Sequence, residues 1–196
     1  MESLQGLCFK ALINLACLLS IRFDCYAEDS DLWRDIFSPR SLEIFVYSVG
    51  GDSIDVLKES MLQNGPQSYK GLRYYAETEW EINWQWPLSD ENKAIFEKTN
   101  LSVVYKIILP VYRPSAGGEE LQKKWQLFFL NIVAHELQHA YHAAVARSEI
   151  QEILHHASTQ DGAKAYAVNK EIKKVIQRAR AKDLKIDSND LPAGGL

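Results

Sequence analysis

Residues 135–139 read His-Glu-Leu-Gln-His, an HExxH pentapeptide set within a long stretch of helical periodicity. The flanking apolar residues recur three or four positions apart: Phe128, Ile132, Ala146 and Ile150. At about 100° per residue, His135 and His139 fall in the same stripe as these apolar side chains. The pattern therefore predicts one helix over residues 119–156, with both histidines on its buried face.

The pentapeptide has the spacing of a zinc site. His135 and His139 lie one helical turn apart, so both imidazoles can reach one ion. Glu136 points beside the metal, where it can take a proton from a zinc-bound water. The alternative is a pair of satisfied core histidines, but polar groups on an apolar face need partners, and a metal supplies one. We expect a zinc metallopeptidase with two histidine ligands and Glu136 as general base.

A catalytic zinc usually has three protein ligands and a water. The candidates for the third ligand, or for a place behind the ligands, are His142, Glu171 and Glu149. His142 shares the histidine face but lies about 10.5 Å along the helix from His135, which favours a place behind the ligands. Glu149 needs a break in the helix, whereas Glu171 lies on the next helix. Two aspartates rank below these candidates: Asp161 and Asp187.

A peptidase also needs a donor for the developing oxyanion and a surface for its substrate. Tyr141 is the candidate donor, with Tyr105 and Tyr166 as alternatives. Residues 101–109 form an expected strand beside the active-site helix. That strand is the candidate for binding an extended peptide by β-addition.

The rest of the chain predicts an α+β fold. Strands are expected at Leu42–Val49 and at residues 79–86 and 101–109, and Pro110 should end the third. Asp52 or Ser53 can cap a short helix that Gly65-Pro66 closes, and a second long helix is expected over residues 162–182. We expect a small antiparallel or mixed sheet packed on the HExxH helix and a C-terminal helix, followed by an irregular tail over residues 188–196.

The N-terminus resembles an export signal. Lys10 precedes an apolar run over residues 11–21, which is too short to span a bilayer. We expect residues 1–27 to be a signal peptide, with a buried N-terminal helix as the alternative. All three cysteines lie in that segment: Cys8, Cys17 and Cys25. Residues 28–40 are then a loose acidic lead-in, residues 41–187 the metallopeptidase domain, and the protein is exported to the periplasm or the medium.

Charge and composition limit the partners. The net charge of −4 argues against general nucleic-acid binding. No apolar stretch after residue 27 is long enough to cross a membrane. With no cysteine left after removal of the signal, Zn²⁺ must be held by histidine and carboxylate. The expected partner is a peptide or protein substrate.

Several further motifs resemble those of a known family, the bacterial secreted zinc-dependent proteases of domain-of-unknown-function family 922. They are, in order, Tyr47-Ser48-Val49-x-Gly51, Gly65-Pro66, Thr78-x-Trp80-x-Ile82-x-Trp84, Leu109-Pro110, Trp125, His135-Glu136-x-x-His139 and Glu149-Ile150. The resemblance implies a zincin-like fold and zinc-dependent proteolysis. The chain departs from the family pattern at Gln138, where members often have glycine, and lacks their terminal Thr-x-His-Gly.

Two other functions stay open. A degenerate zincin-like fold would serve as a binding module of the cell envelope without turnover, and loss of the terminal histidine favours that alternative. The intact HExxH disfavours it. A second alternative is a zinc hydrolase of another class, for example one that acts on cell-wall amides.

Overall fold

A computed structural model describes residues 30–67, 71–113, 118–160 and 162–189. The expected signal peptide and most of the expected tail lie outside these residues. The described chain is α+β, as predicted, with two long helices and a small mixed sheet. None of its helices combines the length and apolarity needed to cross a membrane.

The sheet has three strands in the order β1-β3-β2. β1 (Leu42–Val49) runs parallel to β3 (Asn100–Tyr112), and β2 (Glu77–Gln85) runs antiparallel to it. Of the two alternatives expected, the mixed sheet is therefore the one observed. The central strand β3 contains residues 101–109, the segment expected to bind peptides by β-addition. Residues 105–108 pair with strands on both edges and cannot add a peptide, whereas residues 101–104 pair with β2 alone.

β3 continues through Pro110, which was expected to end it. Tyr105 N and Arg113 N both donate to carbonyls on the β1 side, so odd-numbered residues of β3 turn their amides toward β1. The nitrogen of Pro110 faces the β2 side, where pairing has already stopped at Ile108. Because no ladder hydrogen bond is needed there, the strand tolerates proline.

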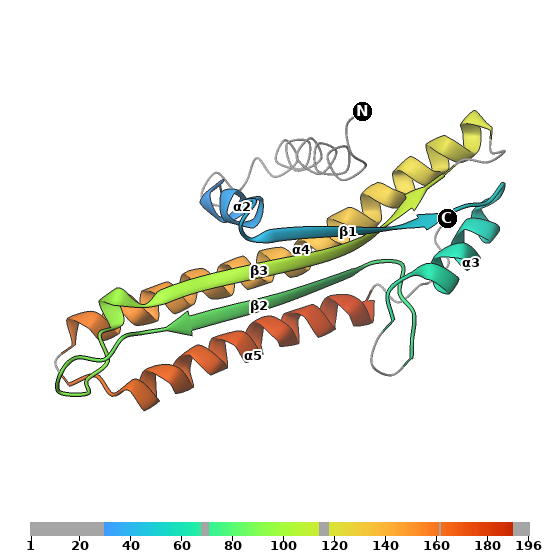
Figure 1. Cartoon of the computed structure of the whole chain (residues 1–196). Helices are drawn as coiled ribbons and strands as arrows, with labels where there is room; N and C mark the ends of the chain where they lie inside the picture. Colours follow the sequence, from blue (N-terminus) through green and yellow to red (C-terminus); the bar gives the residue numbers. More distant parts are fainter. Residues whose placement is uncertain (1–29, 68–70, 114–117, 161, 190–196) are drawn as a thin grey trace.

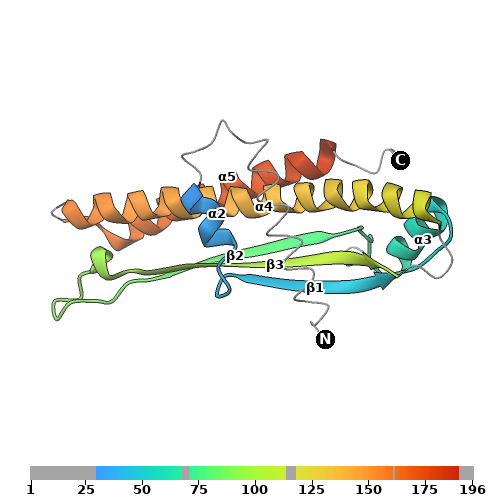
Figure 2. The same cartoon turned by 90° about the horizontal axis from the view of Figure 1, so that it is seen from above.

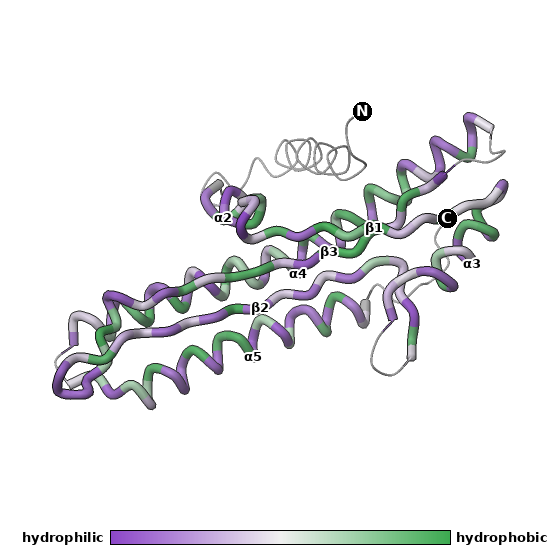
Figure 3. The backbone as a smooth tube through the Cα atoms, in the orientation of Figure 1, coloured by the Kyte–Doolittle hydropathy of each residue, from purple (hydrophilic) through white to green (hydrophobic). Residues whose placement is uncertain are grey.

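Two long helices cover one face of this sheet. They are α4 (Glu119–Thr159) and α5 (Ala165–Asn189), and both lie on the same side of the sheet in Figure 2. Each turn of these helices carries both apolar and polar residues (Figure 3). The apolar stripes meet the sheet in a core that includes Tyr105, Ile150 and Ile172, each 0 % exposed. The two helices thus form an antiparallel hairpin over β3 and β2 (Figure 1).

The shorter helices flank this assembly. α3 (Ile54–Asn64) begins after Ser53, whose Oγ accepts a hydrogen bond from Val56 N, and ends at Gly65, as predicted. α2 (Ser30–Ile36) was not expected, because residues 28–40 lack a clear period. Ile36 is fully buried and Trp33 stacks on Tyr141 of α4, so this segment packs against the domain instead of forming a loose lead-in.

α5 also extends beyond the predicted end at residue 182. The sequence from Asp183 to Asn189 is rich in Asp, Ser and Asn, which are weak helix formers. Asp183 nevertheless bonds to Trp80 of β2 and His142 of α4. These contacts hold the last turns of α5 against α4. Asp187 therefore lies in a helix, and Ser188 and Asn189 continue that helix instead of starting an irregular tail.

Candidate metal centre

The HExxH segment lies near the middle of α4, against the sheet. His135 and His139 are one turn apart, as helical spacing requires, with their Nε2 atoms separated by 3.2 Å. Their rings meet edge to face at 4.9 Å between centroids. His139 is only 6 % exposed, so the pair stands on the buried side of the helix, as predicted.

A third donor comes from α5. Asp187 Oδ1 lies 3.4 Å from His135 Nε2 and 3.1 Å from His139 Nε2. Among the described residues, these three side chains form the group whose donor atoms lie close enough together to hold a metal ion. The third candidate ligand is thus Asp187, which the sequence ranked below His142, Glu171 and Glu149.

The donor triangle fits zinc. Ligand atoms at zinc's usual bond lengths of about 2.0–2.1 Å, arranged tetrahedrally, are about 3.3–3.4 Å from one another. The three separations in this chain are 3.1, 3.2 and 3.4 Å. Two imidazole nitrogens and one carboxylate oxygen are also a usual donor set for catalytic zinc, with the fourth position left to water.

Glu136 stands beside this triangle and is anchored to β2. Its carboxylate accepts a hydrogen bond of 2.7 Å from Thr78 Oγ1, which also lies 3.2 Å from the Glu136 carbonyl oxygen. The residue is 5 % exposed, and burial raises the pKa of Glu136 although the Thr78 hydrogen bond and both histidines act in the opposite direction. The carboxyl group is therefore held at a fixed place and is largely shielded from bulk solvent.

Asp183 occupies the far side of His139. Its Oδ1 lies 3.2 Å from His139 Nδ1 and 2.8 Å from His142 Nδ1, and its Oδ2 accepts a 2.7 Å hydrogen bond from Trp80 Nε1. Burial opposes the charge of Asp183, but the hydrogen bonds from His139, His142 and Trp80 outweigh it and lower the pKa of this carboxyl. Burial likewise opposes the charge of His139, yet Asp183, Glu136 and Asp187 together raise its pKa.

The other predicted ligand candidates lie elsewhere. His142 bonds to Asp183 and not to the other two imidazoles, because it is one turn too far along a straight helix. Glu149 pairs with Arg178 at 2.7 Å, and Glu171 pairs with Lys174 at 2.8 Å.

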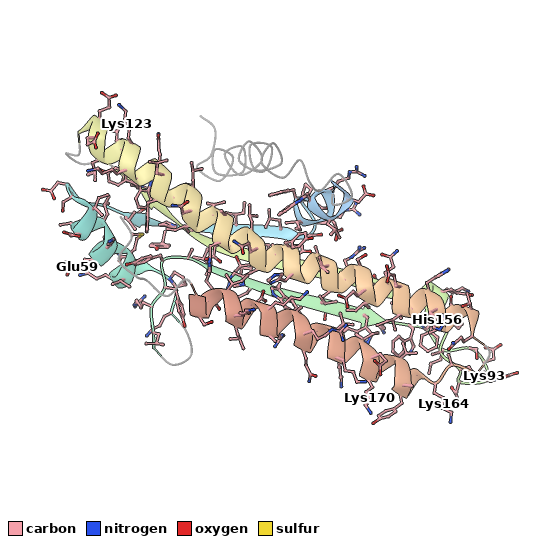
Figure 4. The ribbon with its side chains drawn as sticks, turned by 180° about the vertical axis from the view of Figure 1, so that it is seen from behind. Glu59, Lys93, Lys123, His156, Lys164 and Lys170 are labelled. Carbon is pink, nitrogen blue, oxygen red and sulfur yellow. The ribbon has the colours of Figure 1, made fainter. Side chains whose placement is uncertain are left out.

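Both glutamates line a pocket together with His156 and Lys164. Figure 4 labels His156 and Lys164 at the end of the hairpin where α4 is followed by α5. Neither glutamate is therefore a ligand in the donor triangle. Since α4 stays unbroken through Thr159, it cannot fold back to bring Glu149 to the two histidines. Asp161 lies outside the described residues.

The candidate oxyanion donors are not brought to the histidines either. Tyr141 follows His139 by two positions, which turns it about 200° around the helix. Its ring stacks on Trp33 of α2 at 5.7 Å. Tyr105 is fully buried in the core, and Tyr166 is 80 % exposed at the start of α5.

Three residues of this site were missed as site residues from the sequence: Thr78, Trp80 and Asp183. Asp183 and Asp187 repeat the four-residue spacing of His135 and His139. On two antiparallel helices, such pairs can face each other across one turn. That matched spacing was the available signal for the aspartates, whereas Thr78 and Trp80 stood out only as members of an expected strand and of the family-like motif Thr78-x-Trp80-x-Ile82-x-Trp84.

Comparison with known proteins gives one match. Residues 45–192 match DUF922, a family described as bacterial protein of unknown function. This range includes all three strands except the first residues of β1, together with both long helices. No curated protein and no solved structure matches the chain.

Proposed function

The chain belongs to the DUF922 family, and we propose that it is an exported zinc metallopeptidase with a zincin-like site. His135, His139 and Asp187 are the proposed ligands, and Glu136 is the proposed general base. The observation that carries the proposal is the donor triangle, whose sides of 3.1–3.4 Å suit tetrahedral zinc. The buried carboxylate of Glu136 beside it adds the second component of the chemistry.

Zinc bound there supplies Lewis-acid chemistry, which makes water more acidic and a peptide carbonyl more electrophilic. Glu136 then takes the proton of the attacking water and delivers it to the leaving amine. Thr78 supports this transfer because it donates to Oε2 of Glu136 and fixes the orientation of the carboxyl group. The burial of Glu136 keeps bulk water from competing for the proton.

The free edge of β2 is the proposed surface for an extended substrate. Glu77, Glu79 and Glu81 pair with the residues of β3 whose amides face β2, so the intervening Thr78 and Trp80 turn their backbone groups away from the sheet. No other strand in the described part of the chain pairs with that edge. A peptide added there lies beside Thr78, and thus beside Glu136.

Metal content and hydrolysis test the proposal together. We expect purified protein, stripped with a chelator and refilled with zinc, to hold about one ion per chain. It should hydrolyse a quenched fluorescent peptide library. Glu136→Gln should retain zinc and lose activity by about 10²-fold or more, because general base catalysis is removed. Glu152→Gln, an exposed carboxylate on the same helix, is the matched control and should leave activity unchanged.

The outcomes separate the peptidase from its alternatives. Absence of zinc after refilling would refute the metal centre. Zinc binding without hydrolysis of any peptide would refute the peptidase, and assays on cell-wall amides would then separate the hydrolase of another class from the non-catalytic binding module. Hydrolysis that persists at full rate in Glu136→Gln would refute the assignment of the base.

A further inference from the structure

Asp183 receives hydrogen bonds from two other elements of the fold. Trp80 reaches it from β2, and His139 and His142 reach it from α4. The aspartate itself lies on α5, with its side chain only 15 % exposed. A buried carboxylate that accepts this many donors has little freedom to rotate, because each oxygen is already committed.

We infer that Asp183 is a positioning residue of the metal centre, which rests on the proposed function. Its Oδ1 lies 3.2 Å from Nδ1 of His139. Acceptance of the Nδ1 hydrogen fixes the tautomer of His139 whose Nε2 carries a free lone pair. That Nε2 is the atom that lies 3.2 Å from His135 and 3.1 Å from Asp187. A carboxylate behind a histidine ligand also makes the imidazole a stronger donor to the metal.

Trp80 and His142 complete the arrangement because they hold Asp183. Trp80 donates to Oδ2 at 2.7 Å, which leaves Oδ1 directed at the two histidines. Thr78 and Trp80 are two positions apart, so their side chains project from the same face of β2. One contacts Glu136 and the other contacts Asp183. The edge strand therefore positions both the proposed base and, through Asp183, a metal ligand.

The chain contains a matched control for the Trp80 contact. Trp84, on the same strand, donates from Nε1 to Asn169 Oδ1 of α5 at 3.1 Å. This bond joins the same two elements but reaches no group that contacts the histidines. Trp84→Phe therefore removes a β2–α5 hydrogen bond without touching Asp183, whereas Trp80→Phe removes one of its three donors.

The test is the zinc affinity of the full-length protein, measured by competition with a chromophoric chelator at fixed pH and salt. Asp183→Asn keeps the shape of the side chain and removes its charge. It should weaken zinc binding about 10–100-fold, as loss of such a partner typically does. Trp80→Phe should weaken binding in the same direction by a smaller factor, and Trp84→Phe should bind as wild type. Cobalt substitution adds a spectrum, whose d–d bands should shift in Asp183→Asn and Trp80→Phe only.

The failures are distinguishable. Wild-type protein that binds no zinc would overturn the proposed function and this inference with it. Zinc bound by wild type and equally tightly by Asp183→Asn would overturn the positioning role alone. Circular dichroism of the metal-free variants checks the fold. If Asp183→Asn does not fold, Trp80→Phe decides, since unchanged affinity and an unchanged cobalt spectrum in that variant would overturn the inference.

Discussion

Bound zinc should link the last turn of α5 to the middle of α4. Two proposed ligands are on α4, and the third, Asp187, lies two residues before the end of α5. Its side chain is 54 % exposed, so packing alone does little to hold it. An ion that bonds all three residues is lost when this turn separates from α4. Zinc binding is therefore expected to stabilise the native protein and this turn in particular.

The size of the effect follows from the linkage between binding and folding. At a free zinc concentration 100 times the Kd, binding to the native state adds about 2.7 kcal/mol to the free energy of unfolding. For chains of 150–250 residues, 1 kcal/mol moves the Tm by about 2–4 °C. The expected rise in Tm is therefore about 5–11 °C between chelator-treated and zinc-saturated protein.

Thermal melts and amide hydrogen exchange measure the two parts of this prediction. The melts should show the rise in wild type, and Asp187→Ala should remove most of it. Ser188→Ala is the matched control, because that hydroxyl bonds only the carbonyl of Lys185 on its own helix. Exchange over residues 183–189 should slow when zinc binds, while exchange near Asn169 at the other end of α5 should change little. A full rise in Tm for Asp187→Ala would refute this aspartate as the third ligand.

Three further outcomes follow from the contacts. Thr78→Val removes a hydrogen bond to the Glu136 carboxylate that is worth about 1.5–3 kcal/mol. It should lower kcat about 10–150-fold with zinc content unchanged, and an unaltered kcat would contradict the role of Thr78. Ile172→Ala empties a fully buried position between α5 and the core and should cost about 2–5 kcal/mol in urea unfolding, whereas a loss below 1 kcal/mol would contradict the packing. Glu149→Gln and Glu171→Gln should each leave the zinc Kd unchanged, since both side chains pair with cations away from the histidines; weaker binding in either would restore that residue as a ligand.

Local patterns were sufficient where a segment's neighbours in sequence decide its structure. The strand at Leu42–Val49 alternates over its first residues and is closed by Gly50-Gly51, and Ser53 has the side chain that an N-cap requires. The HExxH spacing placed His135 and His139 on one face of a helix before any tertiary contact was known. The chain also has the family identity that its ordered motifs indicated.

Tertiary contacts decided the rest. The last turns of α5 exist because Asp183 is bonded from β2 and α4, a condition that a propensity scale does not contain. Pro110 stays in β3 only because β2 stops short of it. The four-residue spacing of Asp183 and Asp187 was a signal for these aspartates, but it does not show which turn of α5 faces His135 across the hairpin, and the choice between Asp187 and Glu171 depends on that turn.

The order of the strands sets when this fold can form. β3 lies between β1 and β2 in the sheet but follows both in the chain. During synthesis, neither edge strand has its sheet partner until residues 100–112 have emerged from the ribosome. Until then β1 and β2 have unpaired backbone edges. Glutamates alternate along β2 at positions 77, 79 and 81, and charges at such spacing oppose the self-association of unpaired strands. Completion of the sheet must in turn precede the candidate metal centre, since Thr78 and Trp80 reach Glu136 and Asp183 only from a β2 that β3 already holds.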